Sequence, residues 1–258
     1  MNRKIAIPMT LLSAVPATAL AAHKDNRPNI IVILVDDMGF SDLQCYGGEV
    51  QSTNLNYLAD NGIRFTNFYN TSRSCPTRAS LLTGLYQHQA GIGRMTFDNH
   101  SPGYRGTLSR DAVTIAEVLK GAGYNTTMVG KWHIAETPLQ EDQRDWLNHK
   151  VFHETFSDLC NYPVNRGFDT HYGLIYGVVD YFDPFSLVEG EVPINEVPKG
   201  YYTTNAFSER AMQDIDRLSK RTSRFSCISH TTPPTGPSMP SRRTSRSTRT
   251  RSPAVGRQ

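Results

Sequence analysis

The chain has 258 residues and a mass of 28.9 kDa, with 38% hydrophobic and 20% charged residues, which suffices for one large α/β domain with a hydrophobic core. This composition disfavours membrane-embedded, collagen-like and wholly disordered proteins. Eight of the 27 Lys and Arg residues lie in residues 221–258, which contain no Asp or Glu, so the first 220 residues carry 19 basic against 24 acidic side chains and a net charge of −5. A mildly acidic body argues against a basic binding surface, and we expect no nucleic-acid partner.

The first 22 residues have the organisation of a secretory signal peptide. Two basic residues at positions 3 and 4 precede an apolar stretch over residues 5–20, and a small-residue cleavage site, Ala-Leu-Ala, closes it. The stretch is short and interrupted by Pro8 and Pro16, which argues against a membrane span, and Ala22 rather than a lipid-bearing cysteine follows. We therefore expect a signal peptide over residues 1–21, no stable membrane anchor, and a mature protein that is periplasmic or secreted from a bacterium.

A continuous apolar run, Asn-Ile-Ile-Val-Ile-Leu-Val, occupies residues 29–35. Its length and β-branched content predict a strand buried on both faces of a parallel sheet. Asp36 and Asp37 follow at once. Because ligands of open α/β sheets bind at the carboxyl ends of the strands, these two carboxylates are candidate functional groups, with a solvated strand end or a helix cap as the alternative.

Helical and extended patterns alternate along the rest of the chain. We expect helices over residues 54–59, 75–83, 114–121 and 206–218, strands over 63–69 and 125–129, and long loops with a small hairpin over 134–200. The strand over 125–129 delivers Lys131 and His133 from its carboxyl end. Such alternation predicts an α/β fold with a doubly wound, mostly parallel sheet flanked by helices.

Residues 74–84, Ser-Cys-Pro-Thr-Arg-Ala-Ser-Leu-Leu-Thr-Gly, are the most informative segment. Pro76 suits a first helical turn, so Ser74 lies at or just before the helix N-terminus, beside free backbone N–H groups and the positive end of the helix dipole. That position suits an anionic tetrahedral ester. Arg78, one turn along, reaches back toward the same point with a forked set of donors. Taken alone, Ser74 would be an ordinary cap and Arg78 a surface ion-pair partner.

The segment resembles the signature of the sulfatase family in its serine-type form, in which Ser74, Pro76 and Arg78 precede Leu-Leu-Thr-Gly. Further matches follow the family order: Val-Asp-Asp-Met-Gly at 35–39, Cys-Tyr-Gly-Gly at 45–48, Ile-Arg-Phe-Thr at 63–66 and Gly-Lys-Trp-His at 130–133. The resemblance covers about residues 28–220. It implies an alkaline-phosphatase-like fold, with residues 22–220 forming the N-terminal part of the catalytic domain.

This resemblance implies a sulfuric ester hydrolase that releases inorganic sulfate from aryl or carbohydrate sulfate esters. In the family, the residue at the place of Ser74 is oxidised to formylglycine, whose hydrate is the nucleophile. For serine-type members an anaerobic radical enzyme performs this oxidation before export, and we expect such a maturing enzyme as a partner. Cys75 lies one position out of register for the conversion.

The family also implies roles for the other motif residues. Asp36, Asp37 and the converted Ser74 would bind one divalent cation, calcium, through hard oxygen ligands. Arg78 would steady the formylglycine, Lys131 would bind the sulfate oxygens, and His133 would hydrogen-bond the formylglycine hydroxyl.

Two other functions remain as alternatives. Related folds with metal-bound Ser or Thr nucleophiles hydrolyse phosphate or phosphonate esters, and a degenerate member would only bind sulfated glycans. Four aromatic residues fit either a substrate pocket or ordinary packing: Tyr176, Tyr181, Phe182 and Phe185. The four cysteines have irregular spacing and are expected to be unpaired thiols.

Residues 221–258 change composition abruptly, with fifteen Ser or Thr and five Pro, and predict a basic disordered tail. A sharper hypothesis is translation out of frame. When the third base of each codon is joined to the first two of the next, the permitted residues include Asp-Lys-Pro-Phe-Phe-Leu-Tyr-Leu-Ala and then Ala-Pro-His-Trp-Pro, which resembles the next strand and histidine loop of the family.

The given chain lacks that histidine loop, the later Asp/Asn metal pair and the second lysine of the family. We therefore expect it to fold poorly and to be weakly active or inactive.

Overall fold

The computed structural model describes residues 26–137 and 155–231. Its centre is a six-stranded sheet in which the first four strands across are parallel and the last two are antiparallel. Across the sheet the order is β1 (Ile30–Val35), β6 (Phe225–Thr231), β2 (Asn125–Lys131), β3 (Thr170–Leu174), β4 (Leu187–Glu189) and β5 (Val192–Pro193). The predicted mostly parallel sheet is confirmed.

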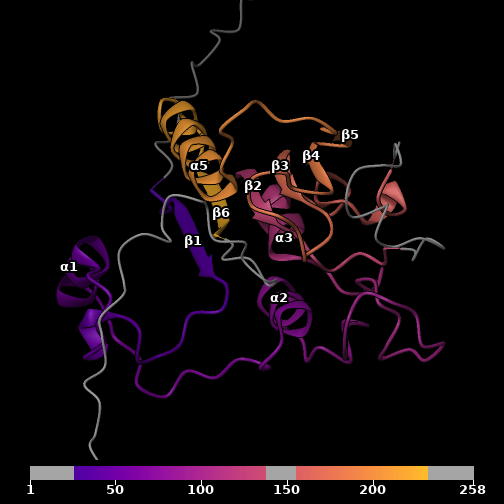
Figure 1. The fold of residues 1–258 in the computed structure, drawn as a ribbon, viewed down its shortest axis with the longest axis horizontal. Coiled ribbons are helices and arrows are strands. Elements are labelled where there is room, and N and C mark those ends of the chain that lie inside the picture. The colour runs from indigo at the N-terminus through magenta and orange to yellow at the C-terminus, as the bar shows by residue number, and fades with distance from the viewer. Residues whose placement is uncertain (1–25, 138–154, 232–258) are drawn as a thin grey trace, which may run out of the picture.

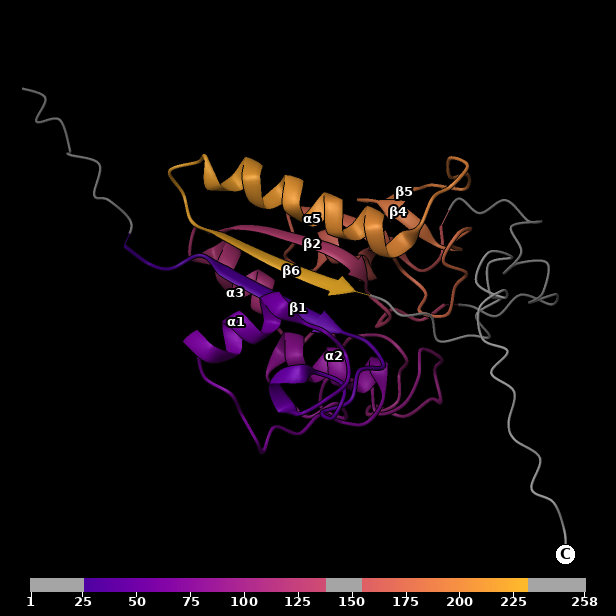
Figure 2. The same ribbon diagram turned by 60° about the vertical axis from the view of Figure 1, so that its left-hand side comes forward.

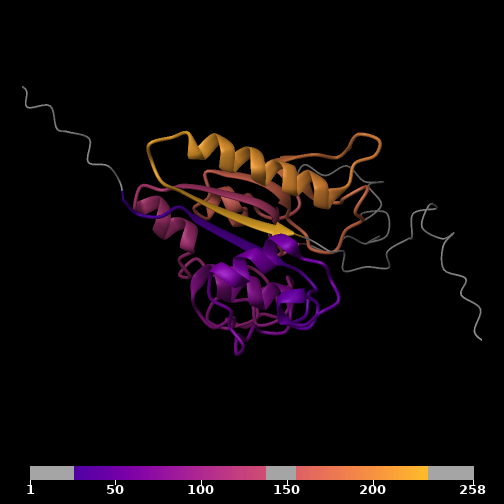
Figure 3. The same cartoon turned by 90° about the vertical axis from the view of Figure 1, so that its left-hand side faces the viewer.

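Helices lie on both sides of this sheet, as the doubly wound prediction requires. They are α1 (Thr53–Asn61), α2 (Ser74–Thr83), α3 (Ile115–Gly121) and α5 (Thr203–Ser219). Single 3-10 turns occupy Gln44–Tyr46, Leu159–Asn161 and Pro163–Asn165. Figures 2 and 3 show α5 along one face, while α1, α2 and α3 lie on the other side.

Local signals explain where these helices begin and end. Thr114 accepts a hydrogen bond from the backbone N–H of Glu117, whose carboxylate accepts one from the N–H of Thr114, so the predicted capping box opens α3. Gly84 ends α2 with a φ of 70°, a conformation that glycine adopts at little cost. Phe207 and Leu218 are buried on the inner face of α5, which packs on β6 and β2.

The strand β6 corrects the expectation that residues 221–258 form a disordered tail. Residues 225–231 pair in parallel with β1 on one side and with β2 on the other, so they are central to the sheet. Phe225, Cys227 and Ile228 supply the buried apolar side chains that make this pairing favourable. Residues 232–258 lie outside the described residues.

The first strand forms as predicted, but its burial on both faces is wrong. Ile31 is 48% exposed and Ile33 is 55% exposed. These two residues share one face of β1, and no helix in the described part of the chain covers it. The helix that follows β1 does not do so, because α1 buries none of its residues.

The strand expected over residues 63–69 is also wrong. Every residue from 61 to 70 is exposed, and the segment runs as an irregular loop. The segment has an alternating sequence, but within the described structure it has no neighbouring strand with which to pair. Conversely β3 falls in a region expected to hold loops, because Thr-His-Tyr-Gly-Leu has no apolar run to signal it. A Cβ at Gly173 would overlap the backbone of Gly130, so glycine is needed for β2 and β3 to pair.

The expected signal peptide, residues 1–21, lies outside the described residues. Within the ranges that the structure describes, no helix combines the length and the apolar character needed to cross a membrane.

Candidate active site

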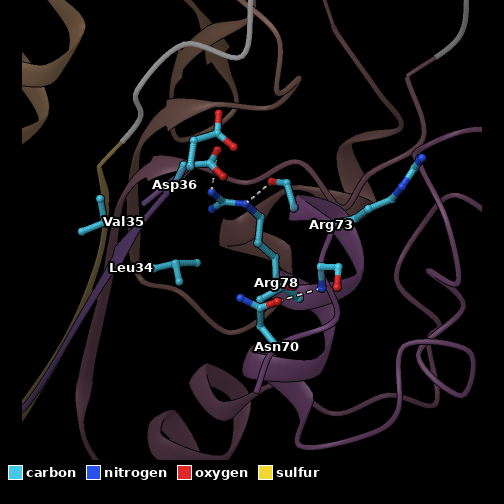
Figure 4. A pocket seen from close by; sticks show the side chains of 10 residues that line it. Leu34, Val35, Asp36, Asn70, Arg73 and Arg78 are labelled. Carbon is cyan, nitrogen blue, oxygen red and sulfur yellow. Dashed lines mark hydrogen bonds and ion pairs between the residues drawn. The ribbon is translucent and has the colours of Figure 1, made fainter. Parts of the chain in front are cut away.

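A pocket of about 170 Å³ opens where the carboxyl end of β1 meets the N-terminal end of α2 (Figure 4). Ten residues line it: Leu34, Val35, Asp36, Asp37, Asn70, Ser72, Arg73, Ser74, Thr77 and Arg78. The parallel strands point their carboxyl ends toward this point, and the helix presents its positive end to it. The sequence-predicted residues of the two segments therefore meet in space.

Ser74 is the first residue of α2, and its hydroxyl faces two other predicted site residues. Its Oγ accepts a hydrogen bond from Nε of Arg78 at 2.9 Å, and lies 3.4 Å from Nδ1 of His133. The first contact follows from helical geometry, because residues four apart share one face. The second joins α2 to the segment beyond β2, which is distant in sequence.

Cys75 faces the opposite way. It is fully buried, with its Sγ 3.9 Å from Sδ of Met95, and burial raises the pKa of its thiol to about 12. A buried, protonated thiol is a poor nucleophile and is inaccessible to a modifying enzyme. Of the two neighbours, Ser74 is therefore the one that faces the pocket, and its catalytic role stays a prediction.

Three charged side chains form a buried cluster beside Ser74. Oδ2 of Asp36 lies 2.6 Å from Nζ of Lys131 and 3.4 Å from Nη2 of Arg78. Arg78 also donates through Nη1 to the backbone carbonyl of Lys131 at 2.7 Å. The side chains of Arg78 and Lys131 are each 1% exposed, so this network holds the ends of β1, β2 and α2 together.

The charges in this cluster favour binding of an anion. Burial lowers the pKa of Arg78, and burial, with repulsion from Arg78 as the next cause, lowers the pKa of Lys131. Arg78 and Lys131 share the buried carboxylate of Asp36, and the exposed carboxylate of Asp37 also acts on Arg78. With the exposed Arg73 on the pocket wall, three cations face two carboxylates, which leaves one net positive charge. A sulfate group at the pocket would compensate that excess and accept hydrogen bonds from guanidinium donors.

His133 has a left-handed backbone with φ of 55° and is 2% exposed. Burial, reinforced by the nearby charges of Lys131 and Arg78, holds its pKa well below its usual value, so the ring is neutral at pH 7. Its Nε2 is buried and has no hydrogen-bond partner within the described residues. Gly177 packs against the ring, where an added Cβ would come within 2.0 Å of Nδ1.

The expected cation ligands agree in kind with a hard metal ion. Asp36 is nearly buried, while Asp37 is exposed at the pocket with φ of 50°. Together with Ser74 they offer carboxylate and hydroxyl oxygens, which calcium prefers, although calcium takes about six to eight oxygens in all. Within the described residues no cluster of three or more His, Cys, Asp or Glu is present, so this set is a partial coordination shell.

Lys131 and His133 do not line the pocket itself but contact residues that do. Lys131 was expected to bind sulfate oxygens, and here it is paired with Asp36. Sequence analysis missed four lining residues: Asn70, Ser72, Arg73 and Thr77. The sequence feature that could have identified these residues is their position within four residues of Ser74.

The four aromatic residues divide between packing and surface. Phe185 is 2% exposed and stacks edge-on with Phe156, so it belongs to the core. Tyr176 lies edge-on to His133, with ring centroids 5.9 Å apart. Tyr181 and Phe182 instead contact Tyr202, and Tyr181 also lies within electrostatic reach of Asp37 at the pocket. All four cysteines are free, as expected.

Comparison with known proteins shows the family of this chain. The family model described as Sulfatase matches residues 28–254, which is most of the chain. The chain belongs to the sulfatase family. The matched range extends beyond residue 220, at which we expected the family-like sequence to end.

Among curated relatives of this sulfatase-family chain, an arylsulfatase of Klebsiella aerogenes is 31% identical over 227 residues, which are 86% of this chain and 46% of that protein. Two solved structures are also similar. Ps i-CgsB, in complex with k-i-k-neocarrahexaose, is 25% identical with a TM-score of 0.62, over 80% of this chain and 45% of that one. BT4656, in complex with its substrate D-glucosamine-2-N,6-O-disulfate, is 31% identical with a TM-score of 0.55, over 79% and 34%. The chain therefore spans less than half the length of each of these proteins.

Proposed function

We propose that this chain is the N-terminal part of a sulfuric ester hydrolase, which cleaves sulfate esters and releases inorganic sulfate. The observation that carries the proposal is the position of Ser74. Its hydroxyl is contacted by both Arg78 and His133, at a helix N-terminus beside the Asp36–Lys131 pair. Family membership supports the same chemistry.

Binding of the sulfate group is the task of the two buried cations. The Arg78 guanidinium is held in place by the hydrogen bonds that it donates to Ser74 and to the carbonyl of Lys131. Its remaining N–H groups therefore have a set direction. A fixed donor needs no reorganisation as charge develops on the transferring group, which is the basis of electrostatic stabilisation. Lys131 adds a second positive charge from the end of β2.

The nucleophile in this proposal is the oxidised side chain of Ser74. Oxidation of a serine to formylglycine removes two hydrogen atoms, one from the hydroxyl and one from Cβ, and a radical dehydrogenase is the class of enzyme that would accept them. When hydrated, the resulting aldehyde supplies the hydroxyl that attacks sulfur while the ester oxygen leaves. The half-buried position of Ser74 at the pocket wall supports access to both enzyme and substrate.

His133 is suited to hydrogen bonding and proton movement at this position. It is neutral, and its Nδ1 lies 3.4 Å from Oγ of Ser74. A neutral imidazole accepts a proton from a hydroxyl and later returns it, which is general acid–base catalysis. Its buried and unpartnered Nε2 is a second polar atom that a bound group would satisfy.

We further propose calcium as the cation, held by Asp36, Asp37 and the converted side chain of Ser74. A divalent cation at this place supplies Lewis acidity that lowers the pKa of a bound hydroxyl. The carboxylate of Asp37 is exposed at the pocket, where a cation could reach it, and it also acts electrostatically on Arg78. We also propose that the protein is exported and that residues 1–21 are removed. In this proposal the oxidation of Ser74 takes place before export.

A sulfated sugar with a second anionic group is the substrate class that the pocket favours. Arg73 lines the pocket next to Ser74, is exposed, and has no ion pair within the described residues. BT4656, similar in sequence and fold, is in complex with a substrate that carries two sulfate groups. An unpaired guanidinium beside the reacting residue would bind the second group by a forked pair of hydrogen bonds.

Mass spectrometry of the peptide that contains Ser74 tests the proposal after co-expression with a maturing enzyme. The expected result is loss of two hydrogens from this residue, with sulfate released from an aryl sulfate and from a disulfated glucosamine. Ser74→Ala is the matched control and should show neither. A chain continued to full sulfatase length that keeps plain serine and releases no sulfate from either compound would contradict the proposed function.

A further inference from the structure

A second cavity, of about 270 Å³, lies at the end of the sheet opposite to the Ser74 pocket. Figures 1 and 2 show α5 packed along β6 and β2, so the last turn of α5 lies beside the beginnings of these strands. Polar side chains of both layers line the cavity: Asn125, Thr127, Asp169 and Thr170 from the strands, and Arg217 and Arg221 from the end of the helix. A water molecule occupies about 30 Å³ in the liquid, so the cavity has room for more than a single small ion.

The hydroxyl groups at this cavity are oriented by a buried carboxylate. Oγ1 of Thr127 lies 3.2 Å from Oδ2 of Asp214 and 2.7 Å from Oγ1 of Thr170. Asp214 is ion-paired with Arg217 and only accepts hydrogen bonds, so the single hydroxyl proton of Thr127 goes to it. Thr170 then donates its own proton to Thr127. The oxygen of Thr170 therefore meets a ligand as an acceptor and not as a donor.

Asp169 is a second acceptor on the same wall. Its Oδ2 accepts a hydrogen bond from the backbone N–H of Thr126 at 2.9 Å, and its Oδ1 lies 2.8 Å from Nζ of Lys120. Each carboxylate oxygen has two lone pairs, so Asp169 can accept a further hydrogen bond. A ligand of this wall has to carry donors, such as hydroxyl groups.

Two arginines four residues apart supply donors on the opposite wall. Nη2 of Arg217 lies 2.6 Å from Asp214, and Nη1 of Arg221 donates to the amide oxygen of Asn125 at 3.0 Å. Each guanidinium has five N–H donors, so most of them are not used by these contacts. Arg221 has no ion pair within the described residues, because its partner Asn125 is neutral. A ligand of this wall has to carry acceptors.

The charged groups around the cavity do not balance. The cations are Lys120, Arg210, Arg217 and Arg221, and the carboxylates that pair with them are Asp169, Glu189 and Asp214. Four cations against three carboxylates leave one net positive charge, that of Arg221. This charge stands out because the first 220 residues carry a net charge of −5. An anionic group on the ligand would compensate it.

We propose that this cavity binds an anionic sugar unit of a sulfated polysaccharide, at a second site that goes beyond the proposed function. The sulfate oxygens accept forked hydrogen bonds from Arg217 and Arg221. The sugar hydroxyls donate to Thr170 and Asp169. Free inorganic sulfate carries no proton at neutral pH, so it satisfies the first wall and not the second.

The position of the cavity gives this site a use. Asn125 begins β2 and Lys131 ends it, so the two sites are about 20 Å apart along this strand. A polysaccharide held at the cavity raises the local concentration of its own sulfate groups around the protein. If the proposed hydrolysis at Ser74 takes place, this second site retains a long substrate between successive reactions.

Titration of the full chain with disulfated glucosamine, followed through the NMR signals of the backbone amides, locates the site. Residues 125–127, 169–170 and 217–221 should shift together, with a midpoint separate from that of residues 72–78. Arg73→Gln, at the Ser74 pocket, should leave the shifts of the first group unchanged. Absence of these shifts, or their loss in Arg73→Gln, would overturn the proposal. No turnover is needed, so a failure of hydrolysis at Ser74 is a separate result.

Arg221→Gln tests the unmatched charge. Binding of disulfated glucosamine at the cavity should weaken about tenfold, as for loss of a charge-assisted hydrogen bond. The only side-chain hydrogen bond of Arg221 is the one to Asn125, so the fold should be unaffected. Lys220→Gln removes the same charge from the neighbouring residue, which pairs with Asp216, and should change the affinity less than twofold. Equal weakening in both variants would show an unspecific effect of charge and refute the site.

Inorganic sulfate and unsulfated N-acetylglucosamine test the two walls separately. Each should bind at least tenfold more weakly than disulfated glucosamine. Thr170→Val removes an acceptor without changing the charge, so it should weaken the disulfated sugar several-fold and leave inorganic sulfate unaffected. Inorganic sulfate that binds as tightly as the disulfated sugar would contradict the role of the hydroxyl groups. Equally tight binding of a short single-stranded DNA would assign the cavity to anions in general, and the choice of a sugar would be wrong.

Discussion

Arg78 donates from Nε to the hydroxyl of Ser74 one helical turn before it, across 2.9 Å, while its Nη2 lies 3.4 Å from the Asp36 carboxylate. One guanidinium thereby links the residue at the helix N-terminus to the residue at the end of β1. The five donors of a guanidinium have fixed directions. Arg78 therefore orients the residues of the site and also supplies it with a positive charge.

Arg78→Lys should separate these two contributions. The lysine keeps the positive charge but has no fork, so it holds either Ser74 or Asp36 and not both. In a matured chain continued to full sulfatase length, we expect kcat/KM for sulfate ester hydrolysis to fall by about 10²-fold, the cost typical of losing one fixed donor. Arg105→Lys alters an exposed ion pair with Asp98 and should change the rate little. An Arg78→Lys enzyme with unchanged kcat/KM would contradict the positioning role.

Gly177→Ala tests the support of the His133 ring. The new Cβ would come within 2.0 Å of Nδ1, the atom that faces Ser74, so the ring has to leave its present position. We expect kcat to fall more than KM rises, because proton movement is impaired while the anion site is intact. Gly121→Ala has open space and is the control. Equal kcat in both variants would show that the ring position is unimportant.

The elements that could be predicted from sequence are those determined locally. The turn of helix between Ser74 and Arg78, and the capping box at Thr114, need only their own residues. The segment 63–69 alternates like a strand, but a strand also needs a neighbour, and the described chain provides none. β3 escaped prediction for the opposite reason, since its pairing with β2 compensates for a polar sequence.

Within the site, the direct pairings between side chains depend on long-range contacts that could not be predicted from the sequence. Motif order indicated that Asp36 and Lys131 belong to one site. Their direct pairing at 2.6 Å depends on β6 lying between β1 and β2, which sequence patterns did not specify. Arg73 was missed because an exposed arginine in isolation has no distinguishing pattern. Only its place on the pocket wall gives it significance.

Arg73→Gln tests the second anionic group on the substrate. We expect KM for a disulfated glucosamine to rise about tenfold, as for loss of a charge-assisted hydrogen bond, with little change in KM for a simple aryl monosulfate. Lys220→Gln removes the same charge at the far end of the sheet and should affect neither substrate. A parallel rise in KM for both substrates would instead assign Arg73 to the reacting sulfate.

His171 should make the folded state sensitive to acid. It is 1% exposed on β3, its Nε2 faces the carbonyl of Gly130 at 3.3 Å, and burial lowers its pKa to about 4. The unfolded chain takes up a proton at its ordinary pKa, about 6.5, whereas the folded chain resists protonation until about pH 4. Stability from this residue is therefore complete above pH 6.5 and is lost as the pH falls toward 4, by on the order of 3 kcal/mol.

Urea unfolding of the full chain between pH 4 and pH 7 checks this dependence. His133, whose pKa is also lowered by burial, contributes in the same direction, so the single variant His171→Gln should flatten the curve only in part. His100→Gln, at a side chain that is 91% exposed, is the control and should leave the slope unchanged. If His171→Gln retains the full loss of stability below pH 6.5, the residue does not bury a neutral ring in the folded state, and the acid sensitivity has to be assigned to other groups.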